Sequence, residues 1–364
     1  MPDRQDLLLL GATGSIGAST LQILRKFPER FRLVGFSYHK NEDLAQSIAR
    51  EFDCPHFCSS QTGFSWNDVT SLAHDICVQA IVGAAGVEPS IQLAASGKRL
   101  LLANKESLVV AGELFNSVCA ANQTKVLPVD SEHNSLYRLL QNNEGIKKLI
   151  LTASGGPLRS YNKEEMAVVT KAQVLNHPTW SMGDKITVDS AGLINKALEI
   201  MEAHYLFKVP YDKIEAVIHP QSLVHAAVQA KDGSLRLHVS APDMKIPIAH
   251  GLFYPEEAPE SDQELPLDQM QSFTFESIDK EKFPGFKLGI EAGHAGGVMP
   301  MIFNAANEAA NQAFRQDLIP FSGIAKFIAN KMAEKSGDQA VQSLEELLGR
   351  NSEYLTMFAR ELKC

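Results

Sequence analysis

Short apolar runs alternate with stretches of helical spacing over the first 130 residues. The runs hold few polar residues and are bounded by turns, as in strands that are buried on both faces of a sheet. We predict strands at Leu7–Leu10, Arg32–Phe36, Ala80–Gly86 and Arg99–Ala103, a strand end at Lys125–Leu127, and helices at Ala18–Lys26, Asn41–Glu51 and Leu108–Ala121. Strands that alternate with helices predict an α/β domain built on a parallel sheet.

The pattern changes after residue 130. Further strands are predicted at Lys148–Thr152, Lys185–Ser190, Glu215–Ser222, Leu223–Val228 and Ser234–Ser240, and helices at Glu164–Val174 and from Gly192 onward. Asp232-Gly233, between the last two strands, is typical of a β-hairpin turn. This segment therefore predicts a second sheet with helices.

The last third of the chain begins with an extended connector, because Glu256–Gln271 is rich in Pro, Glu and Asp and has no period. Stretches of helical spacing follow, and they predict a small helical bundle. These stretches are Lys287–Ala292, Met301–Asp317, Ile324–Lys335 and Gln339–Lys363.

The charge of the chain excludes some partners. The net charge is 34 − 43 = −9, whereas binders of nucleic acid or anionic membranes need clustered Lys and Arg. No apolar stretch approaches the roughly 20 residues of a membrane span. The N-terminus has no targeting pattern, and the five cysteines are scattered without a disulfide framework. We expect a cytoplasmic protein with neither a nucleic-acid nor a membrane partner.

A glycine turn joins the first predicted strand to the first predicted helix. Strand, glycine turn and helix in this order are the context in which such a turn binds a dinucleotide, because the backbone can approach the pyrophosphate and the helix N-terminus supplies N–H groups. A tight strand–helix turn without a ligand is the alternative. The candidate cofactor residues are Gly11, Thr13, Gly14, Ser15, Ile16 and Gly17.

The end of the second strand indicates which dinucleotide would bind. Sheets that bind NAD often carry Asp or Glu there to hold the ribose hydroxyls. This chain has Ser37-Tyr-His-Lys-Asn41, with no acid and one lysine. Lys40 therefore favours the 2′-phosphate of NADP, although it could equally be an ordinary loop cation.

Two carboxylates after the Lys125–Leu127 run are candidate metal ligands. Asp130 and Glu132 are two positions apart, so on an extended segment both side chains point to the same side. A divalent cation that prefers oxygen ligands would relieve their repulsion. A solvated strand end is the alternative.

A mixed polar stripe is predicted on one later helix. Asn195, Glu199 and Glu202 are spaced i, i+4 and i+7, with Lys196 beside them. Such a stripe is usually a solvated, salt-bridged face. Glu199 could instead be a third oxygen ligand for the cation, while Asn195 and Lys196, with Ser190, could bind a phosphate.

Three loops carry further candidates. Lys105 follows a strand at the edge where open α/β sheets bind ligands, although polar loops are common there. Ala153-Ser-Gly-Gly156 is either an anion-binding nest or a plain glycine turn. Asn176–Gly183 places a Trp and a Met in a Pro/Gly loop, which is typical of a flap that folds onto a ligand. Packing of Trp180 on its own domain is the alternative.

These motifs together resemble the 1-deoxy-D-xylulose 5-phosphate reductoisomerase family. The resemblance spans nearly the whole chain, and the ordered set is more specific than any one motif. Its segments are Gly11–Gly17, Ala103–Ser107, Val129–Asn134, Ala153–Pro157, His177–Gly183, Asn195–Glu199, His219–Ser222, Pro242–Met244 and Asn304–Glu308. The chain departs from the family at Asp184, where a basic residue commonly follows the flap.

The resemblance implies a reaction and its cofactors. Members use NADPH and Mg²⁺ or Mn²⁺ to convert 1-deoxy-D-xylulose 5-phosphate, a sugar phosphate, into 2-C-methyl-D-erythritol 4-phosphate for isoprenoid synthesis. A homodimer is implied as well. The implied fold class is α/β, with an N-terminal Rossmann-type domain that binds NADPH (1–129), a central α+β catalytic domain (130–254) with a flap at 176–185, a connector (255–284) and a C-terminal helical bundle (285–364).

The resemblance also implies roles for individual residues. Lys105, Asp130 and Glu132 would be catalytic, and Asp130, Glu132 and Glu199 would bind the metal. The flap would carry His177, Trp180 and Met182. The substrate would contact Ser131, Glu132, Ser154, His177, Ser190, Asn195, Lys196 and Glu199. The cofactor would contact Gly11, Thr13, Gly14, Ser15, Ile16, Gly17, Lys40, Asn41, Asn104, Glu106 and Gly183.

Other functions remain as alternatives. One is a different NADP-dependent dehydrogenase of a phosphorylated substrate, and another is an NADP-sensing protein without catalysis, which would have no use for converging carboxylates. A semialdehyde-type dehydrogenase begins with a similar glycine turn but needs a nucleophilic cysteine at mid-chain. No cysteine lies between Cys119 and Cys364.

Overall fold

The computed structural model describes residues 4–363 except 142–144, 181, 262, 264, 268–269, 271, 339–340 and 342. The chain forms two compact units. The first contains residues 1–107, 113–137 and 243–264, and the second contains residues 108–112, 138–242 and 265–364. Among the described residues, no helix is long and apolar enough to cross a membrane.

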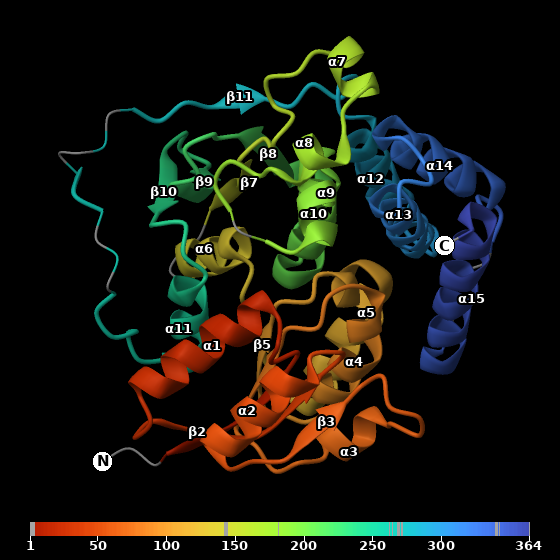
Figure 1. Ribbon diagram of the computed structural model, residues 1–364. Coiled ribbons are helices and arrows are strands. Elements are labelled where there is room, and N and C mark those ends of the chain that lie inside the picture. Colours follow the sequence, from red (N-terminus) through yellow and green to blue (C-terminus); the bar gives the residue numbers. More distant parts are fainter. Residues whose placement is uncertain are drawn as a thin grey trace. The chain divides into compact units, whose positions relative to one another are not determined.

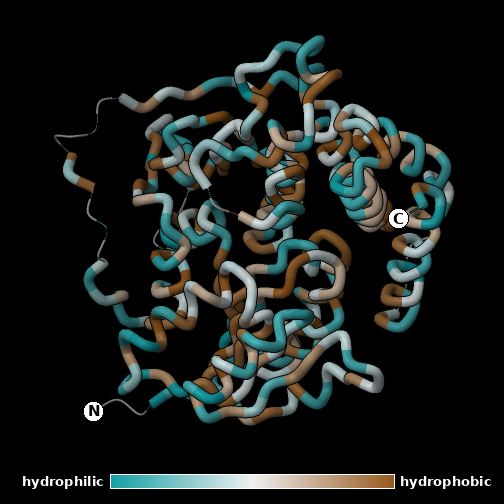
Figure 2. The backbone as a smooth tube through the Cα atoms, viewed as in Figure 1, coloured by the Kyte–Doolittle hydropathy of each residue, from teal (hydrophilic) through white to brown (hydrophobic). Residues whose placement is uncertain are grey.

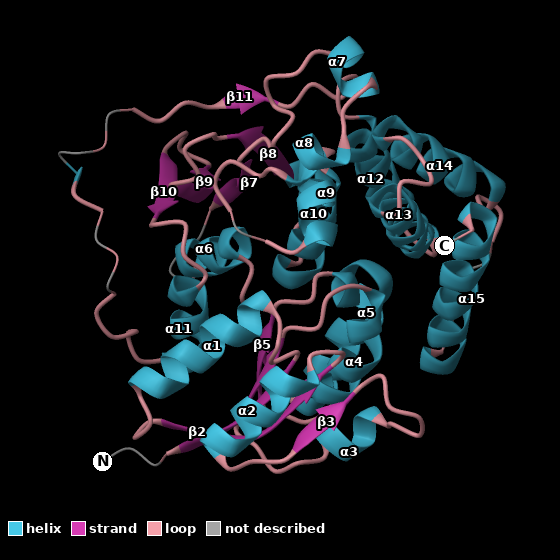
Figure 3. Ribbon diagram, viewed as in Figure 1, coloured by secondary structure: helices cyan, strands magenta, loops and turns pink. Residues whose placement is uncertain are grey.

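The described part of the first unit is built on a parallel sheet of six strands in the order β3-β2-β1-β4-β5-β6 (Figures 1 and 3). This is the strand order of doubly wound nucleotide-binding sheets. The strands are β1 (Gln5–Leu10), β2 (Phe31–Tyr38), β3 (His56–Cys58), β4 (Ile76–Gln79), β5 (Arg99–Leu102) and β6 (Lys125–Pro128). The prediction of an α/β fold with a parallel N-terminal sheet is thus confirmed.

Helices follow most of these strands, as the sequence predicts. They are α1 (Ser15–Lys26), α2 (Glu42–Phe52), α3 (Trp66–Thr70), η1 (Ala84–Gly86), α4 (Val87–Ala94), α5 (Glu106–Asn122), α6 (Ser131–Leu140) and α11 (Lys245–Phe253). Leu7, Leu8, Leu9 and Leu10 are fully buried in β1, in agreement with a strand covered on both faces.

Helix α11 brings the chain back to the first unit after residue 242. The Phe253 ring makes edge-to-face contacts with Phe27 and Phe31, each with ring centroids 5.1 Å apart. A side chain at Gly251 would collide with Leu101, because its Cβ would lie 2.8 Å from that leucine. The sequence prediction placed α11 with the central segment, so these contacts are new information about the core.

The described part of the second unit contains a mixed sheet in the order β10-β9-β7-β8-β11 (Figure 1). Strand β7 is parallel to β8 and antiparallel to β9. The strands are β7 (Ile146–Ala153), β8 (Ile214–Ile218), β9 (Val224–Ala230), β10 (Leu235–Val239) and β11 (Glu276–Ser277). The hairpin predicted around Asp232-Gly233 is confirmed by the antiparallel pairing of β9 with β10.

The second unit also contains the helices predicted near the C-terminus. Gln339, the predicted start of the last of them, lies outside the described residues. Helices α14 and α15 alternate hydrophilic and hydrophobic positions along their length (Figure 2). The helices are α7 (Lys163–Ala167), α8 (Lys171–Leu175), α9 (Asp184–Ala191), α10 (Ile194–Phe207), η2 (Tyr211–Lys213), α12 (Pro284–Ala295), α13 (Met299–Arg315), α14 (Phe321–Glu334) and α15 (Leu344–Leu362).

Two predicted strands are wrong. The strand predicted at Ala80–Gly86 lies earlier, at Ile76–Gln79, and the small residues after it form a loop whose carbonyl oxygens at Ile81 and Gly83 accept hydrogen bonds from Asn104. The segment Lys185–Ser190 is helix α9 rather than a strand. Its alternation of apolar and polar residues resembles a strand, but packing against α13 favours the helix.

The helix predicted at Glu164–Val174 is two short helices, α7 and α8. Each begins with a capping box: Asn162 with Glu165, and Thr170 with Gln173. These reciprocal side-chain bonds satisfy the first backbone N–H groups of a helix. The second box starts a new helix where a single helix had been predicted.

Candidate active site

The glycine turn after β1 exposes the N-terminus of α1. Gly11 has φ +85°, and a Cβ there would lie 2.7 Å from the carbonyl oxygen of Ala80, so only glycine fits. Gly14 caps α1 without a side-chain hydrogen bond. The first backbone N–H groups of α1 are therefore in position to bind an anion such as a pyrophosphate.

Lys40 and Asn41 lie at the end of β2, and both are exposed. Asn41 caps α2 by accepting a hydrogen bond from the backbone N–H of Leu44 (3.2 Å). The Ser60 hydroxyl donates to the carbonyl oxygen of His39 (2.7 Å), so the end of β3 fixes the backbone just before Lys40. This places a cation at the edge where the ribose of a dinucleotide would lie.

Asn104 and Glu106 form a buried network after β5. Asn104 donates to the carbonyl oxygens of Ile81 (2.7 Å) and Gly83 (2.9 Å) and to the Glu106 carboxylate (3.1 Å). Their side chains are 1% and 5% exposed. Asn104 therefore holds the loop after β4 in place, and Glu106 holds Asn104.

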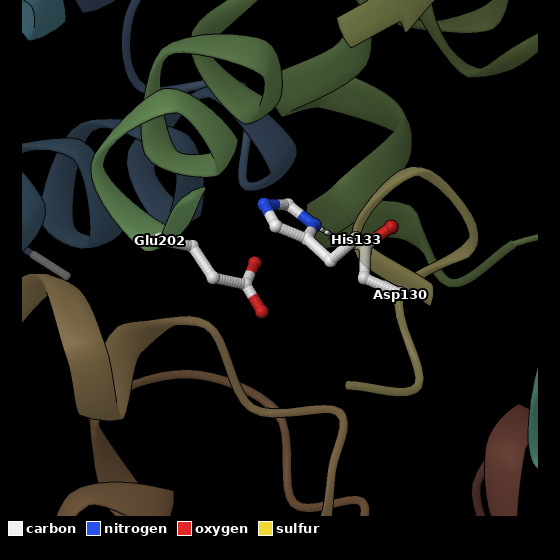
Figure 4. A group of neighbouring side chains, drawn as sticks. All are labelled: Asp130, His133 and Glu202. Carbon is white, nitrogen blue, oxygen red and sulfur yellow. Dashed lines mark ion pairs between the residues drawn. The ribbon is translucent and has the colours of Figure 1, made fainter. Parts of the chain in front are cut away.

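Lys105 lies beside Asp130 in the first unit. The Lys105 Nζ is 2.8 Å from Asp130 Oδ2, and the His133 Nδ1 is 3.9 Å from the same oxygen. Figure 4 shows the His133 ring beside the Asp130 carboxylate. Lys105 is 7% exposed and His133 is fully buried. Burial of an ammonium group and an imidazole ring beside a carboxylate is costly and is typical of a functional site.

The prediction that Asp130 and Glu132 lie on an extended segment is wrong, because helix α6 begins at Ser131. Asn134 fixes this start by donating to the carbonyl oxygen of Pro128 (2.9 Å), while its backbone N–H bonds to the carbonyl oxygen of Asp130 (2.8 Å). Ser131 donates to the Glu132 carboxylate. Asp130 thus precedes the helix and Glu132 lies in its first turn.

Helix α10 of the second unit holds charged groups inside the protein. The Glu199 carboxylate accepts hydrogen bonds from Asn195 and Lys196. Lys196, Glu199 and Glu202 are 4%, 2% and 0% exposed. The solvated-face interpretation of this stripe is therefore wrong.

The nest predicted after β7 packs directly on the end of α9. Gly156 has φ +66°, and a Cβ there would lie 2.5 Å from the carbonyl oxygen of Ser190. The Gly156 N–H donates to the Ser154 hydroxyl oxygen (3.2 Å). Asn195 and Lys196 lie in the first turn of α10. Hydroxyl, ammonium and amide donors from three elements of one unit suit an anionic group.

His177 organises the flap, which is predicted at 176–185 but is taken as residues 176–183 because α9 begins at Asp184. The backbone N–H groups of Thr179 (3.2 Å) and Trp180 (2.9 Å) both donate to its Nδ1, which must therefore be unprotonated. The proton is then on Nε2, which donates to the Ser154 hydroxyl 3.1 Å away. Burial lowers the pKa of His177, which favours this neutral form.

The rest of the flap is only partly described. The Trp180 ring lies edge-on to His225, with centroids 6.3 Å apart. Met182 is half-buried and Gly183 caps α9, whereas Ser181 lies outside the described residues. Asp184 lies in the first turn of α9, where a negative charge interacts favourably with the helix dipole.

Two candidate residues were missed in the sequence. His133 follows Asp130 by three positions, so a helix beginning at Ser131 brings it near that carboxylate. Glu202 was noted on the polar stripe but not chosen, and it is fully buried on the same helix as Glu199. The signal for Glu202 was a carboxylate between apolar neighbours, Met201 and Ala203.

Family models match the chain in several segments. The 1-deoxy-D-xylulose 5-phosphate reductoisomerase model matches residues 7–63 and 64–112. The model of its C-terminal domain matches residues 126–207, and a model described as the DXP reductoisomerase C-terminal domain matches residues 239–354.

Two curated relatives carry the same name, 1-deoxy-D-xylulose 5-phosphate reductoisomerase. The protein of Leptospira borgpetersenii serovar Hardjo-bovis (strain JB197) is 46% identical over 93% of this chain and 92% of its own. That of Pelotomaculum thermopropionicum (strain DSM 13744 / JCM 10971 / SI) is 40% identical over 94% of this chain and 95% of its own.

Solved structures agree with the curated relatives. A DOX-P reductoisomerase in complex with NADPH, fosmidomycin and magnesium is 35% identical, with a TM-score of 0.90 over 99% of this chain and 98% of that chain. The 1-deoxy-D-xylulose 5-phosphate reductoisomerase of Zymomonas mobilis in complex with NADPH is 33% identical, with a TM-score of 0.87 over 99% of both chains.

Proposed function

Because this chain belongs to the 1-deoxy-D-xylulose 5-phosphate reductoisomerase family, we propose that it isomerises 1-deoxy-D-xylulose 5-phosphate and reduces the product with NADPH to 2-C-methyl-D-erythritol 4-phosphate. The observation that carries the proposal is the charged cluster on α10. Lys196 and Glu199 are almost fully buried, at 4% and 2% exposed. Buried ion pairs are weak contributors to stability, so such a cluster favours a role in chemistry.

We propose Asp130, Glu132 and Glu199 as ligands of Mg²⁺ or Mn²⁺. The donor set fits these cations, because all three side chains offer carboxylate oxygens and none offers sulfur. A bound cation of this kind polarises carbonyl and hydroxyl oxygens of the substrate as a Lewis acid. Lys105 holds Asp130, and Asn195 and Lys196 hold Glu199, so these two carboxylates are oriented by contacts within their own units.

The phosphate of the substrate is proposed to bind to Ser154, Ser190, Asn195 and Lys196. Ser154 accepts hydrogen bonds from His177 and from the Gly156 N–H, which leaves its own proton available to donate to a phosphate oxygen. The phosphate is remote from the reacting carbons, so its binding energy can position the substrate and close the flap. Trp180 and Met182 would then exclude water, and Lys105 and Ser131 would contact the substrate.

NADPH is proposed to lie on the first unit, as a Rossmann-type sheet requires. Its pyrophosphate would meet the turn from Gly11 to Gly17 at the N-terminus of α1, and Lys40 would bind the 2′-phosphate. Gly183 would approach the cofactor when the flap closes. Asn104 and Glu106 would support the loop beside the nicotinamide.

The remaining expectations stay proposals. We infer a cytoplasmic homodimer with the domain boundaries predicted from the sequence. Strand β10 ends the described order of the second sheet, and its Leu235 and Leu237 are 57% and 41% exposed. A second copy pairing along this edge would bond to the outer backbone groups of β10 and place its own side chains beside both leucines.

Product identification tests the proposed function. The enzyme is incubated with NADPH, Mn²⁺ and 1-deoxy-D-xylulose 5-phosphate, and the phosphorylated product is identified by ¹³C NMR. We expect 2-C-methyl-D-erythritol 4-phosphate as the product. A product with an unrearranged carbon skeleton would instead support the alternative of another NADP-dependent dehydrogenase.

A further inference from the structure

The flap joins α8 to α9, and both of these helices are hydrogen-bonded to the same later helix, α13. All three helices belong to the second unit. The contact between α9 and α13 joins residues 118 positions apart in the chain. A helix near the C-terminus thus contacts the elements on both sides of the flap.

At the α9 end, a buried carboxylate is held by two amides of α13. Asp189 is 2% exposed. Its Oδ1 accepts hydrogen bonds from the Nδ2 atoms of Asn307 (2.9 Å) and Asn311 (2.8 Å). Asn311 Nδ2 also donates to the carbonyl oxygen of Lys185 (2.9 Å), one turn earlier in α9. Helix α9 is therefore fixed along two turns.

At the α8 end, Lys171 reaches the C-terminal end of α13. Its Nζ donates to the carbonyl oxygen of Arg315 (2.9 Å) and pairs with Asp317. Arg315 in turn donates through Nε to Asn311 Oδ1 (2.8 Å). Asn311 thus donates to α9 through its amide nitrogen and accepts a hydrogen bond from Arg315 through its amide oxygen. The carbonyl oxygen of Arg315 in turn accepts from Lys171.

We propose that α13 anchors both ends of the flap, with Asn311 as the positioning residue that couples them. The expected effect on turnover rests on the proposed function. The expected effect on the flap of the ligand-free protein does not. With both ends held, backbone rotation on closure is confined to residues 176–183, and hinges of this kind determine how reliably a loop closes.

The anchor also bears on the proposed phosphate site. Ser190 directly follows Asp189 in α9, and the Gly156 turn is packed on the Ser190 carbonyl. A shift of α9 would therefore displace donors of that site together with the flap. Loss of one of these hydrogen bonds would change the equilibrium between the open and closed flap by about two- to tenfold.

The experiment uses Trp180 as a reporter of the flap. The chain has two tryptophans, Trp66 and Trp180, so Trp66→Phe leaves only the flap residue. Lys171→Ala and Asn311→Ala are made singly and together in this background. Asn304→Ala is the matched control, because Asn304 is an equally buried amide of α13 and, among the described residues, has its only hydrogen bond with Glu308 of the same helix.

Acrylamide quenching of Trp180 is measured first, without any ligand. We expect the quenching constant to rise about twofold in Lys171→Ala and in Asn311→Ala, to stay at the wild-type value in Asn304→Ala, and to be non-additive in the double variant. The Lys171 side chain is 35% exposed, so this variant keeps its fold even if Asn311→Ala does not. Far-UV circular dichroism checks that both variants are folded.

Turnover is measured next with 1-deoxy-D-xylulose 5-phosphate and Mn²⁺. We expect kcat to fall about three- to tenfold in the two anchor variants, with the KM for NADPH unchanged. Additive quenching effects, or an equal effect of Asn304→Ala, would overturn the coupling, and unchanged quenching in folded variants would overturn the anchor itself. If the wild type failed to turn over the substrate, the proposed function would fail while the quenching still tested the anchor.

Discussion

The pair formed by Lys196 and Glu199 predicts that stability can be restored in a double variant without restoring activity. Both side chains are almost fully buried and hydrogen-bonded to each other, and Glu199 also accepts a bond from Asn195. In Glu199→Gln the side chain keeps its shape but loses its charge. The buried ammonium of Lys196 then faces an amide in place of its counter-ion.

The size of the effect follows from burial. Removing one partner of a buried pair costs about 3–5 kcal/mol, whereas replacing both partners by apolar groups is often neutral or stabilising. We therefore expect Glu199→Gln to lower the stability of the protein by about 3 kcal/mol or more. The double variant Lys196→Met with Glu199→Leu should regain most of that loss while remaining inactive.

Thermal unfolding followed by circular dichroism measures the stabilities, and NADPH oxidation measures activity. NADPH affinity, measured by fluorescence, is the control, and it should be retained because Glu199 lies outside the first unit. A Glu199→Gln variant as stable as the wild type, or an active double variant, would refute this reasoning about the buried pair.

Three further predictions rest on single residues. Gly11→Ala should weaken NADPH binding by about tenfold or more in a fluorescence titration, since the added Cβ meets the Ala80 carbonyl at 2.7 Å; unchanged affinity would contradict it. Lys105→Ala should lower kcat far more than a few-fold, and near-normal turnover would remove its proposed role. Because burial lowers the pKa of His177, its bonds to the flap backbone should persist above pH about 6.5 and be lost as pH falls through the lowered pKa. Trp180 fluorescence in the Trp66→Phe variant that stays flat from pH 8 down to the onset of acid unfolding would contradict this.

Local patterns in the sequence predict most of the elements that position the site. The leucines of β1 and the glycine turn after them identify a strand, a turn and a helix within a few residues of their observed bounds. The hairpin of β9 and β10 and the C-terminal helices follow from patterns of the same short range. These elements depend on neighbouring residues, which a single sequence contains.

Elements that depend on distant residues could not be predicted in the same way. The alternation in Lys185–Ser190 favours a strand, yet α9 forms there because Asp189 is bound by amides from α13. Asp130 and Glu132 are predicted as a pair on an extended segment, and that geometry is wrong because α6 begins between them. The assembly of a metal site from these two residues and Glu199 stays a proposal, because no local pattern joins them.

The proposed metal-dependent reaction is tested most directly by the loss of NADPH absorbance at 340 nm with 1-deoxy-D-xylulose 5-phosphate, after chelation and again after addition of Mg²⁺ or Mn²⁺. We expect oxidation only when both the sugar phosphate and the cation are present, and none from Glu199→Gln, whose folded fraction is checked in parallel. Oxidation by the chelated wild-type enzyme would contradict the assignment of Asp130, Glu132 and Glu199 as metal ligands. Binding of NADPH without oxidation under any cation would contradict the proposed reaction itself.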